Sequence, residues 1–126
     1  MHKSRLGALI IDCQTEDLFQ DAAFWSEALG AAAETREQQA NPKYVRLAGK
    51  PEEIQILLQK VEHPSRVHID IETDNIDAEV QRLETLGAKV LSKLERWVVM
   101  EAPSGQRFCV IGPVRKGFAE NANVWD

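Results

Sequence analysis

The residues Glu27-Ala28-Leu29-Gly30-Ala31 recur, with one difference, as Glu84-Thr85-Leu86-Gly87-Ala88. Each stretch ends a segment whose apolar residues are spaced as on one face of a helix. Each glycine suits the left-handed backbone position that commonly follows a helix. Such a close match, at the end of a predicted helix in both halves, indicates an internal repeat. The repeat divides the rest of the chain into two similar parts.

The first repeat predicts a strand, a helix and three further strands. Residues 7–13 are apolar and rich in strand-forming types, and Thr15-Glu16-Asp17 supplies polar residues that begin helices. The apolar face of the helix consists of Leu18, Ala22, Trp25 and Leu29. The three strand segments that follow are 33–38, 44–47 and 54–59, and a charged turn at Gly49-Lys50-Pro51 joins the last two.

The second repeat has the same order. Residues 66–72 predict a strand, and Thr73-Asp74-Asn75 predicts a helix cap. The apolar face of its helix consists of Ile76, Val80, Leu83 and Leu86, and its later strands are 89–93, 97–102 and 107–111. We therefore predict an α+β protein with a single domain over residues 1–126, made of two βαβββ modules at about 6–61 and 66–112. The tail, 113–126, lacks periodicity and is expected to wrap over a sheet or a neighbouring chain without forming an element.

The composition excludes several classes of protein. The chain has 126 residues and a formal net charge of −5, so one core is expected, and nucleic acid or an anionic membrane is disfavoured as a partner. No apolar stretch approaches the ~18 residues of a membrane span, and the first residues lack a signal-peptide pattern. We therefore expect a cytoplasmic protein with Cys13 and Cys109 as reduced, buried thiols.

Three stretches carry a resemblance to a known superfamily. They are Phe24-Trp25 before Ala28-Leu29-Gly30, then Val67-His68-Ile69-Asp70-Ile71, then Ala102-Pro103-Ser104-Gly105-Gln106-Arg107-Phe108-Cys109-Val110. With the repeated βαβββ order, the chain from about Leu6 to Gly112 resembles the glyoxalase/bleomycin resistance/dioxygenase superfamily, also called vicinal oxygen chelate proteins. The resemblance implies that the curved sheets of the two modules form a cup. It implies no single reaction, because that superfamily includes lyases, dioxygenases, epimerases and drug-binding proteins.

The resemblance also implies where a divalent metal would bind, namely on the first and last strands of each module. The corresponding residues are Ala8 and Leu57 in the first module, and His68 and Cys109 in the second. Ala8 and Leu57 have no donor atom, whereas a metal site needs three or four convergent ligands. We therefore expect no metal cofactor. The alternative is a divalent ion at an atypical site that includes His68 and Cys109.

Alternation along the predicted strands indicates which side chains line the cup. Ile69 and Phe108 would face the helix of the second module, which leaves the polar neighbours on the bare face. The expected ligand-binding residues are His68, Asp70, Arg107, Gln55, Gln59 and Trp97. A few convergent polar groups on an apolar lining are typical of a small-molecule site.

Several of these residues have a second interpretation. Arg107 suits an acidic group of a ligand, but it could instead form an ion pair with Asp70 or Glu72. Either carboxylate could act as a general base if burial raised its pKa. Trp97 could stack on a planar ligand or belong to the core.

The sequence therefore predicts a protein that binds a small organic molecule in the cup without the usual metal. The alternatives are a metal-dependent lyase or dioxygenase with atypical ligands, and a non-catalytic interaction module. No residue is identified as catalytic, and the sequence leaves open whether the protein is an enzyme. Small members of the superfamily commonly form two-fold dimers, so we expect a homodimer.

Overall fold

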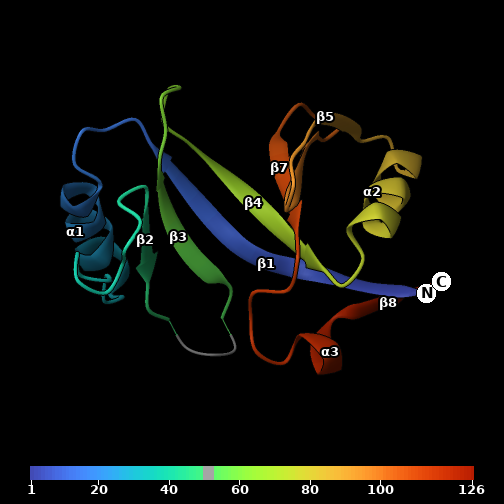
Figure 1. Cartoon of the computed structure of the whole chain (residues 1–126), viewed down its shortest axis with the longest axis horizontal. Helices are drawn as coiled ribbons and strands as arrows, with labels where there is room; N and C mark the ends of the chain where they lie inside the picture. Colours follow the sequence, from blue (N-terminus) through green and yellow to red (C-terminus); the bar gives the residue numbers. More distant parts are fainter. Residues whose placement is uncertain (50–52) are drawn as a thin grey trace. The chain divides into compact units, whose positions relative to one another are not determined.

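The computed structural model describes residues 1–49 and 53–126, and it confirms an α+β protein. Its elements, in chain order, are β1 (His2–Cys13), α1 (Leu18–Leu29), β2 (Tyr44–Leu47), β3 (Gln55–Lys60), β4 (Arg66–Thr73), α2 (Ile76–Thr85), β5 (Lys89–Lys93), β6 (Trp97–Glu101), β7 (Arg107–Ile111), α3 (Phe118–Asn121) and β8 (Asn123–Trp125) (Figure 1). The predicted Gly49-Lys50-Pro51 turn includes residues outside the described ranges. No helix of the described residues is long and apolar enough to cross a membrane.

Two compact units make up the chain, and β1 contributes to both. The first comprises residues 9–67 and has the strand order β2-β3-β1. The second comprises residues 1–8 and 68–126 and has the order β1-β4-β7-β6-β5, with β8 also paired to β1. The boundaries differ from those of the sequence repeats because the first residues of β1 pack with the second unit.

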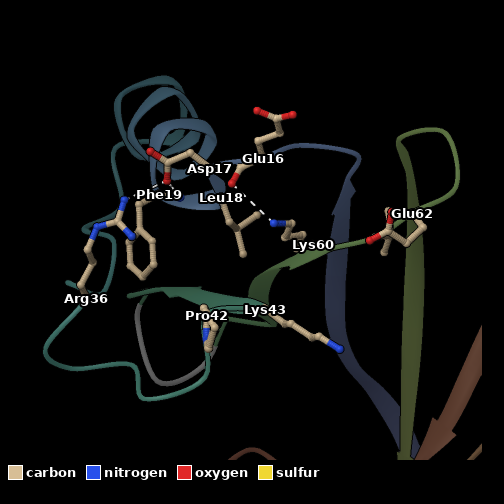
Figure 2. A pocket seen from close by; sticks show the side chains of 10 residues that line it. Glu16, Asp17, Leu18, Phe19, Arg36, Pro42, Lys43, Lys60 and Glu62 are labelled. Atoms are coloured by element: carbon tan, nitrogen blue, oxygen red, sulfur yellow. Dashed lines mark hydrogen bonds and ion pairs between the residues drawn. The ribbon is translucent and has the colours of Figure 1, made fainter.

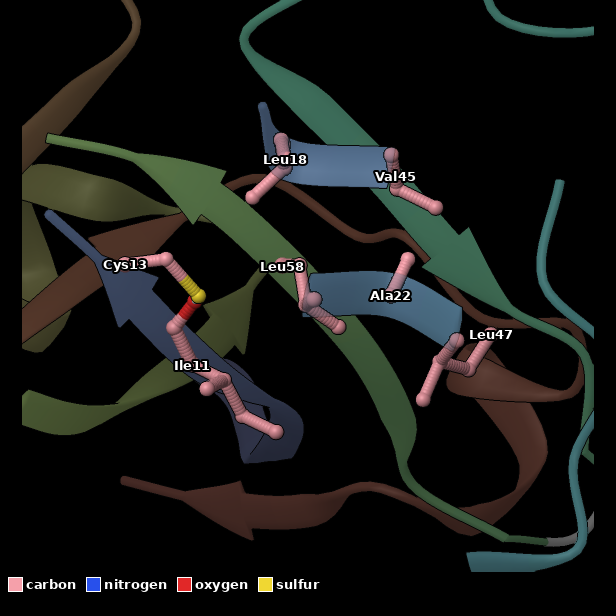
Figure 3. Packing of buried hydrophobic residues seen from close by; sticks show 7 residues of the cluster. All are labelled: Ile11, Cys13, Leu18, Ala22, Val45, Leu47 and Leu58. Atoms are coloured by element: carbon pink, nitrogen blue, oxygen red, sulfur yellow. The ribbon is translucent and has the colours of Figure 1, made fainter. Parts of the chain in front are cut away.

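The 9–67 unit buries the inner face of α1 against β2 and β3. Asp17 caps the helix by accepting a hydrogen bond from the Phe19 backbone N–H, and Gly30 ends it with φ of 67°. The buried cluster shown in Figure 3 consists of Ile11, Cys13, Leu18, Ala22, Val45, Leu47 and Leu58. Leu58 is a member of this cluster and Ile56 packs against it, so alternate residues of β3 face α1.

The second unit places α2 on one face of β5, β6 and β7. Asn75 caps α2 by accepting a hydrogen bond from the Ala78 backbone N–H. The buried cluster consists of Val80, Leu83, Val98, Met100, Phe108 and Val110, with Ile71 packed against it. Because Phe108 and Val110 are in this cluster, alternation along β7 directs Arg107, Cys109 and Ile111 to the opposite face, as predicted.

Two predictions about secondary structure were wrong. The strand expected at 33–38 is reduced to a single bridge between Ala33 and Leu47. The backbone there turns, because the side chains of Thr35 and Gln38 each accept a hydrogen bond from the other's backbone N–H, which competes with strand pairing.

The C-terminal tail forms two elements that the sequence analysis did not predict. Helix α3 buries Phe118, and β8 pairs with β1 so that Trp125 lies opposite His2. The two termini therefore lie side by side (Figure 1). A three-residue strand has too few positions to show a period in sequence, so only the tertiary structure reveals this pairing.

Candidate functional site

Three side chains with donor atoms converge on the face of β4 and β7 opposite α2. Asp70 of β4 lies opposite Cys109 of β7 in a parallel pair, and His68 is two residues earlier on β4. Their ligand atoms all lie within 4.8 Å of one another, and His68 Nε2 is 3.4 Å from Asp70 Oδ1. We call these three residues the donor cluster.

The donor cluster is mostly sheltered from solvent. The side chains of His68 and Asp70 have exposed fractions of 12% and 13%, and Cys109 is half-buried. Asp70 Oδ1 is buried and accepts no hydrogen bond within the described residues. A buried carboxylate oxygen without a hydrogen bond is costly, so this atom is a ready acceptor for a ligand hydroxyl, an N–H group or a cation.

Arg107 and Trp97 lie on the same face as the donor cluster, toward its edges. Arg107 is exposed at the start of β7 and lies opposite Glu101 of β6. Trp97, at the start of β6, lies opposite Ile111 and is 37% exposed, so it does not belong to the core. Both residues are therefore accessible to a ligand on this face, which we call the β4–β7 face.

Glu72 lies on the same face of β4 but does not have the chemistry of a general base. Burial by itself raises the pKa of Glu72, but backbone N–H groups of Val114 and Arg115 and the side chains of Arg5 and Arg115 donate hydrogen bonds that hold this pKa below its usual range. The carboxylate is completely buried. Glu72 is therefore a structural anchor, and its ion pairs are with Arg5 and Arg115, not with Arg107.

The sequence analysis missed the partners of this anchor. Arg5 is at the start of β1, and Arg115 is in the tail, where no periodic pattern marks it. Arg115 also donates to the carbonyl oxygen of Leu6 at 2.6 Å. A buried charge almost always has a partner. The acidic Glu72 within a predicted strand was therefore the one sign in the sequence that basic partners exist.

Gln55 and Gln59 belong to the other unit, on β3. They alternate with Ile56 and Leu58 and so lie on the face of β3 that points away from α1. Across the ladder Gln59 pairs with Tyr44, and Arg46 pairs with Leu57. This face of β2 and β3 therefore has the polar side chains of Gln55, Gln59, Tyr44 and Arg46 around the apolar Leu57.

Ala8 and Leu57 are the two residues without donor atoms that the resemblance placed at metal-binding positions. Ala8 is almost completely buried in β1, and Leu57 is half-buried in β3. The donor cluster, by contrast, supplies a nitrogen, an oxygen and a sulfur, a set that fits Zn²⁺ or a similar divalent ion. Asp70 is thus a third possible metal ligand beside His68 and Cys109, the two that the family resemblance implied.

Comparison with known proteins agrees with this architecture. Residues 8–111 match the family model described as "Glyoxalase-like domain". No curated protein matches the sequence.

Solved structures show the same fold at low sequence identity. Methylmalonyl-CoA epimerase from Mycobacterium tuberculosis is similar with a TM-score of 0.59 and 16% identity, over 90% of this chain and 91% of that one. A hypothetical protein from Bacillus halodurans C-125 has a TM-score of 0.58 and 12% identity, over 90% and 96%. A structure described as NAD-dependent benzaldehyde dehydrogenase from Legionella pneumophila has a TM-score of 0.59 and 9% identity, over 85% and 98%. On the evidence of the family model, which covers most of its length, the chain belongs to the glyoxalase-like domain family.

Proposed function

We propose that this protein binds a small organic acid on the β4–β7 face. The observation that carries the proposal is the convergence of His68, Asp70 and Cys109 within 4.8 Å, on the face opposite α2. Arg107 on the same face supplies the charge that would recognise an acidic group. This arrangement is typical of sites that bind small molecules through a few fixed polar groups.

Each polar side chain would have a distinct role in binding. The guanidinium of Arg107 would donate two hydrogen bonds to the ligand's carboxylate or phosphate. Asp70 Oδ1, which accepts no hydrogen bond within the described residues, would accept one from the ligand. His68, 3.4 Å from that oxygen, would hold the carboxylate in place and could exchange a proton with the ligand.

Replacement of Arg107 tests this proposal. Matched pairs of small carboxylic acids and their neutral amides would be screened by ligand-observed NMR. We expect the acids to bind in preference to the amides, and Arg107→Gln to weaken their binding about tenfold, because a charge-assisted hydrogen bond is lost. The free energy of unfolding should change by less than about 0.5 kcal/mol, since Arg107 is exposed.

Arg96→Gln is the matched control for this experiment. Arg96 is an exposed arginine in the turn between β5 and β6, and its loss should leave acid binding unchanged. Equal weakening by both variants, or equal binding of acids and amides by the native protein, would contradict the assignment of Arg107.

A second candidate function, a metal-dependent lyase or dioxygenase, is favoured by the chemistry of the donor cluster. His68, Asp70 and Cys109 would hold the ion. A bound divalent metal would supply Lewis-acid polarisation of a substrate oxygen. The protein's own part in such chemistry would be the same as above, since Arg107 would orient the substrate's acidic group.

Elemental analysis of protein purified without chelators separates the two functions. Because Ala8 and Leu57 cannot complete the family's ligand set, we expect less than stoichiometric transition metal and no change in melting temperature with a chelator. About one metal ion per chain, lost in both His68→Ala and Asp70→Asn, would establish the metal-dependent alternative instead.

The proposal includes assembly as a homodimer in the cytoplasm. Closed two-fold dimers are the commonest oligomers of soluble proteins, and the superfamily's small members commonly adopt them. The donor cluster and Arg107 lie within one unit of one chain, so the proposed binding roles do not depend on the dimer.

A further inference from the structure

A cavity lies in the 9–67 unit, at the first turn of α1. It has a volume of about 360 Å³, within the range of roughly 300–1,000 Å³ that is typical of small-molecule pockets. The lining residues, shown in Figure 2, are Glu16, Asp17, Leu18, Phe19, Arg36, Pro42, Lys43, Lys60, Val61 and Glu62. We call it the α1 pocket.

Two lysines line the α1 pocket from neighbouring backbone segments. Lys60 ends β3 and continues the alternation of Leu58, which faces α1 in the core. Lys43 is in the turn just before β2, and its carbonyl oxygen accepts a hydrogen bond from the Lys60 backbone N–H at 2.8 Å. The pocket therefore has two cationic side chains in its lining.

The protein itself neutralises these two lysines poorly. Lys60 Nζ donates to the carbonyl oxygen of Glu16 at 3.4 Å, which is a long contact, and the Glu16 carboxylate points away from it (Figure 2). Lys43 Nζ forms no hydrogen bond or ion pair within residues 1–49 and 53–126. Lys60 therefore has capacity for a further acceptor, and Lys43, whose side chain points away from Lys60 in Figure 2, adds positive charge to the lining.

The third cation of the pocket is already fixed in place. Arg36 Nη2 is 2.9 Å from Asp17 Oδ1, and its guanidinium carbon lies 4.4 Å from the centre of the Phe19 ring. Arg36 and Phe19 thus form a flat wall, and Leu18 and Val61 add apolar surface. A planar apolar group would fit against such a wall better than a sugar or a peptide backbone would.

We propose that the α1 pocket binds a small aromatic or otherwise planar anion, whose carboxylate or phosphate contacts Lys60 and is attracted by the charge of Lys43. Glu62 also lines the pocket, and it has no ion pair in the described part of the chain. Its charge opposes an anion. The proposal therefore predicts opposite effects for two charge-removing substitutions in one pocket.

Benzoate, phenyl phosphate and neutral benzyl alcohol are suitable probes, titrated into the full chain and followed by backbone amide NMR. We expect the two anions, but not benzyl alcohol, to shift the amide signals of Leu18, Phe19 and Val61. The two anions also distinguish a carboxylate ligand from a phosphate ligand by their relative affinities. Phenyl phosphate should bind more tightly than benzoate, since it carries more negative charge beside Lys43 and Lys60.

Lys43→Gln should weaken binding of both anions roughly threefold, and Glu62→Gln should strengthen it by a similar factor. Lys43 is preferred to Lys60 for this test because replacing Lys60 would also remove its hydrogen bond to the Glu16 carbonyl oxygen, which could lower the stability of the fold. Lys89→Gln, at an exposed position on β5 of the other unit, is the control and should change nothing.

Three results would overturn the proposal. They are equal shifts with benzyl alcohol, the same sign of effect for Lys43→Gln and Glu62→Gln, and anion-induced shifts that appear only outside the 9–67 unit. Arg107→Gln should leave these shifts unchanged, so failure of the β4–β7 site and failure of the α1 pocket are distinguishable.

Discussion

Glu72→Gln is expected to lower the free energy of unfolding by about 3 kcal/mol, because it removes the negative charge of a buried ion-pair network and replaces one acceptor oxygen with an NH2 group that faces N–H donors. The two oxygens of Glu72 accept four hydrogen bonds, from the backbone N–H groups of Val114 and Arg115 and from the Nε atoms of Arg5 and Arg115, at 2.7 to 3.2 Å. The side chains of Arg5 and Arg115 are themselves only 12% and 14% exposed. Urea denaturation would measure the loss.

The same network makes stability depend on pH. The pKa of Glu72 is lowered in the folded protein, and so is the pKa of Glu79. Burial raises the pKa of Glu79, but hydrogen bonds from the side chains of Arg82 and His2 lower it by more. A carboxylate with a lowered folded pKa contributes its full stability above the unfolded value, about 4.3, and loses it as the pH falls through the folded value. Stability should therefore decrease as the pH falls below about 4.3, and Glu72→Gln should make this decrease smaller.

Glu84→Gln serves as the control for both measurements. Glu84 is exposed on α2 in the same unit, and its replacement should change the free energy of unfolding by less than about 0.5 kcal/mol. If Glu72→Gln cost no more than Glu84→Gln, the carboxylate would not hold the tail in solution, and its assignment as an anchor would be wrong.

Leu58→Ala is expected to lower the free energy of unfolding by about 2–5 kcal/mol, through lost burial and the cavity that remains. Leu58 is 0% exposed in β3 and packs between Val45, Ala22 and the other members of the cluster in Figure 3. Thermal or urea unfolding would measure the effect.

Leu29→Ala is the corresponding control, because Leu29 is on the same unit's helix but is 48% exposed. Its replacement should cost less than about 1 kcal/mol. A cost for Leu58→Ala no larger than that for Leu29→Ala would show that the cluster around α1 is not packed as described.

The periodic part of the fold was predictable from sequence. The two helices, their caps at Asp17 and Asn75, and the inward-facing residues Phe108 and Val110 all follow from patterns within a few residues of one another. Local patterns succeed there because a helix or strand has one repeating period, and burial of one face enforces it. The prediction of a strand at 33–38 was wrong because the side chains of Thr35 and Gln38 form local hydrogen bonds that turn the backbone. The hydrophobic pattern of the segment does not reveal these hydrogen bonds.

The candidate site was only partly predictable. Alternation predicted that His68 and Asp70 share a face, because that is a property of one strand. The proximity of Cys109 to Asp70 depends on the register of the parallel pair between β4 and β7, which no local pattern specifies. The binding roles predicted for Gln55, Gln59 and Arg107 stay predictions, and the acid-binding experiment tests that of Arg107.

The sequence alone therefore determined the α+β class, the repeated helix and strand order, and the polar face of β4. Each of these follows from the spacing of apolar and polar residues along the chain. The tertiary structure decided what depends on contacts between distant residues. It gave Glu72 its partners from β1 and the tail, paired β8 with β1, and brought Lys43 and Lys60 together at the α1 pocket. Such contacts arise because a buried charge or an unpaired strand edge is costly unless another group hydrogen-bonds to it. That group can be far away in the sequence, so the spacing of residues along the chain does not identify it.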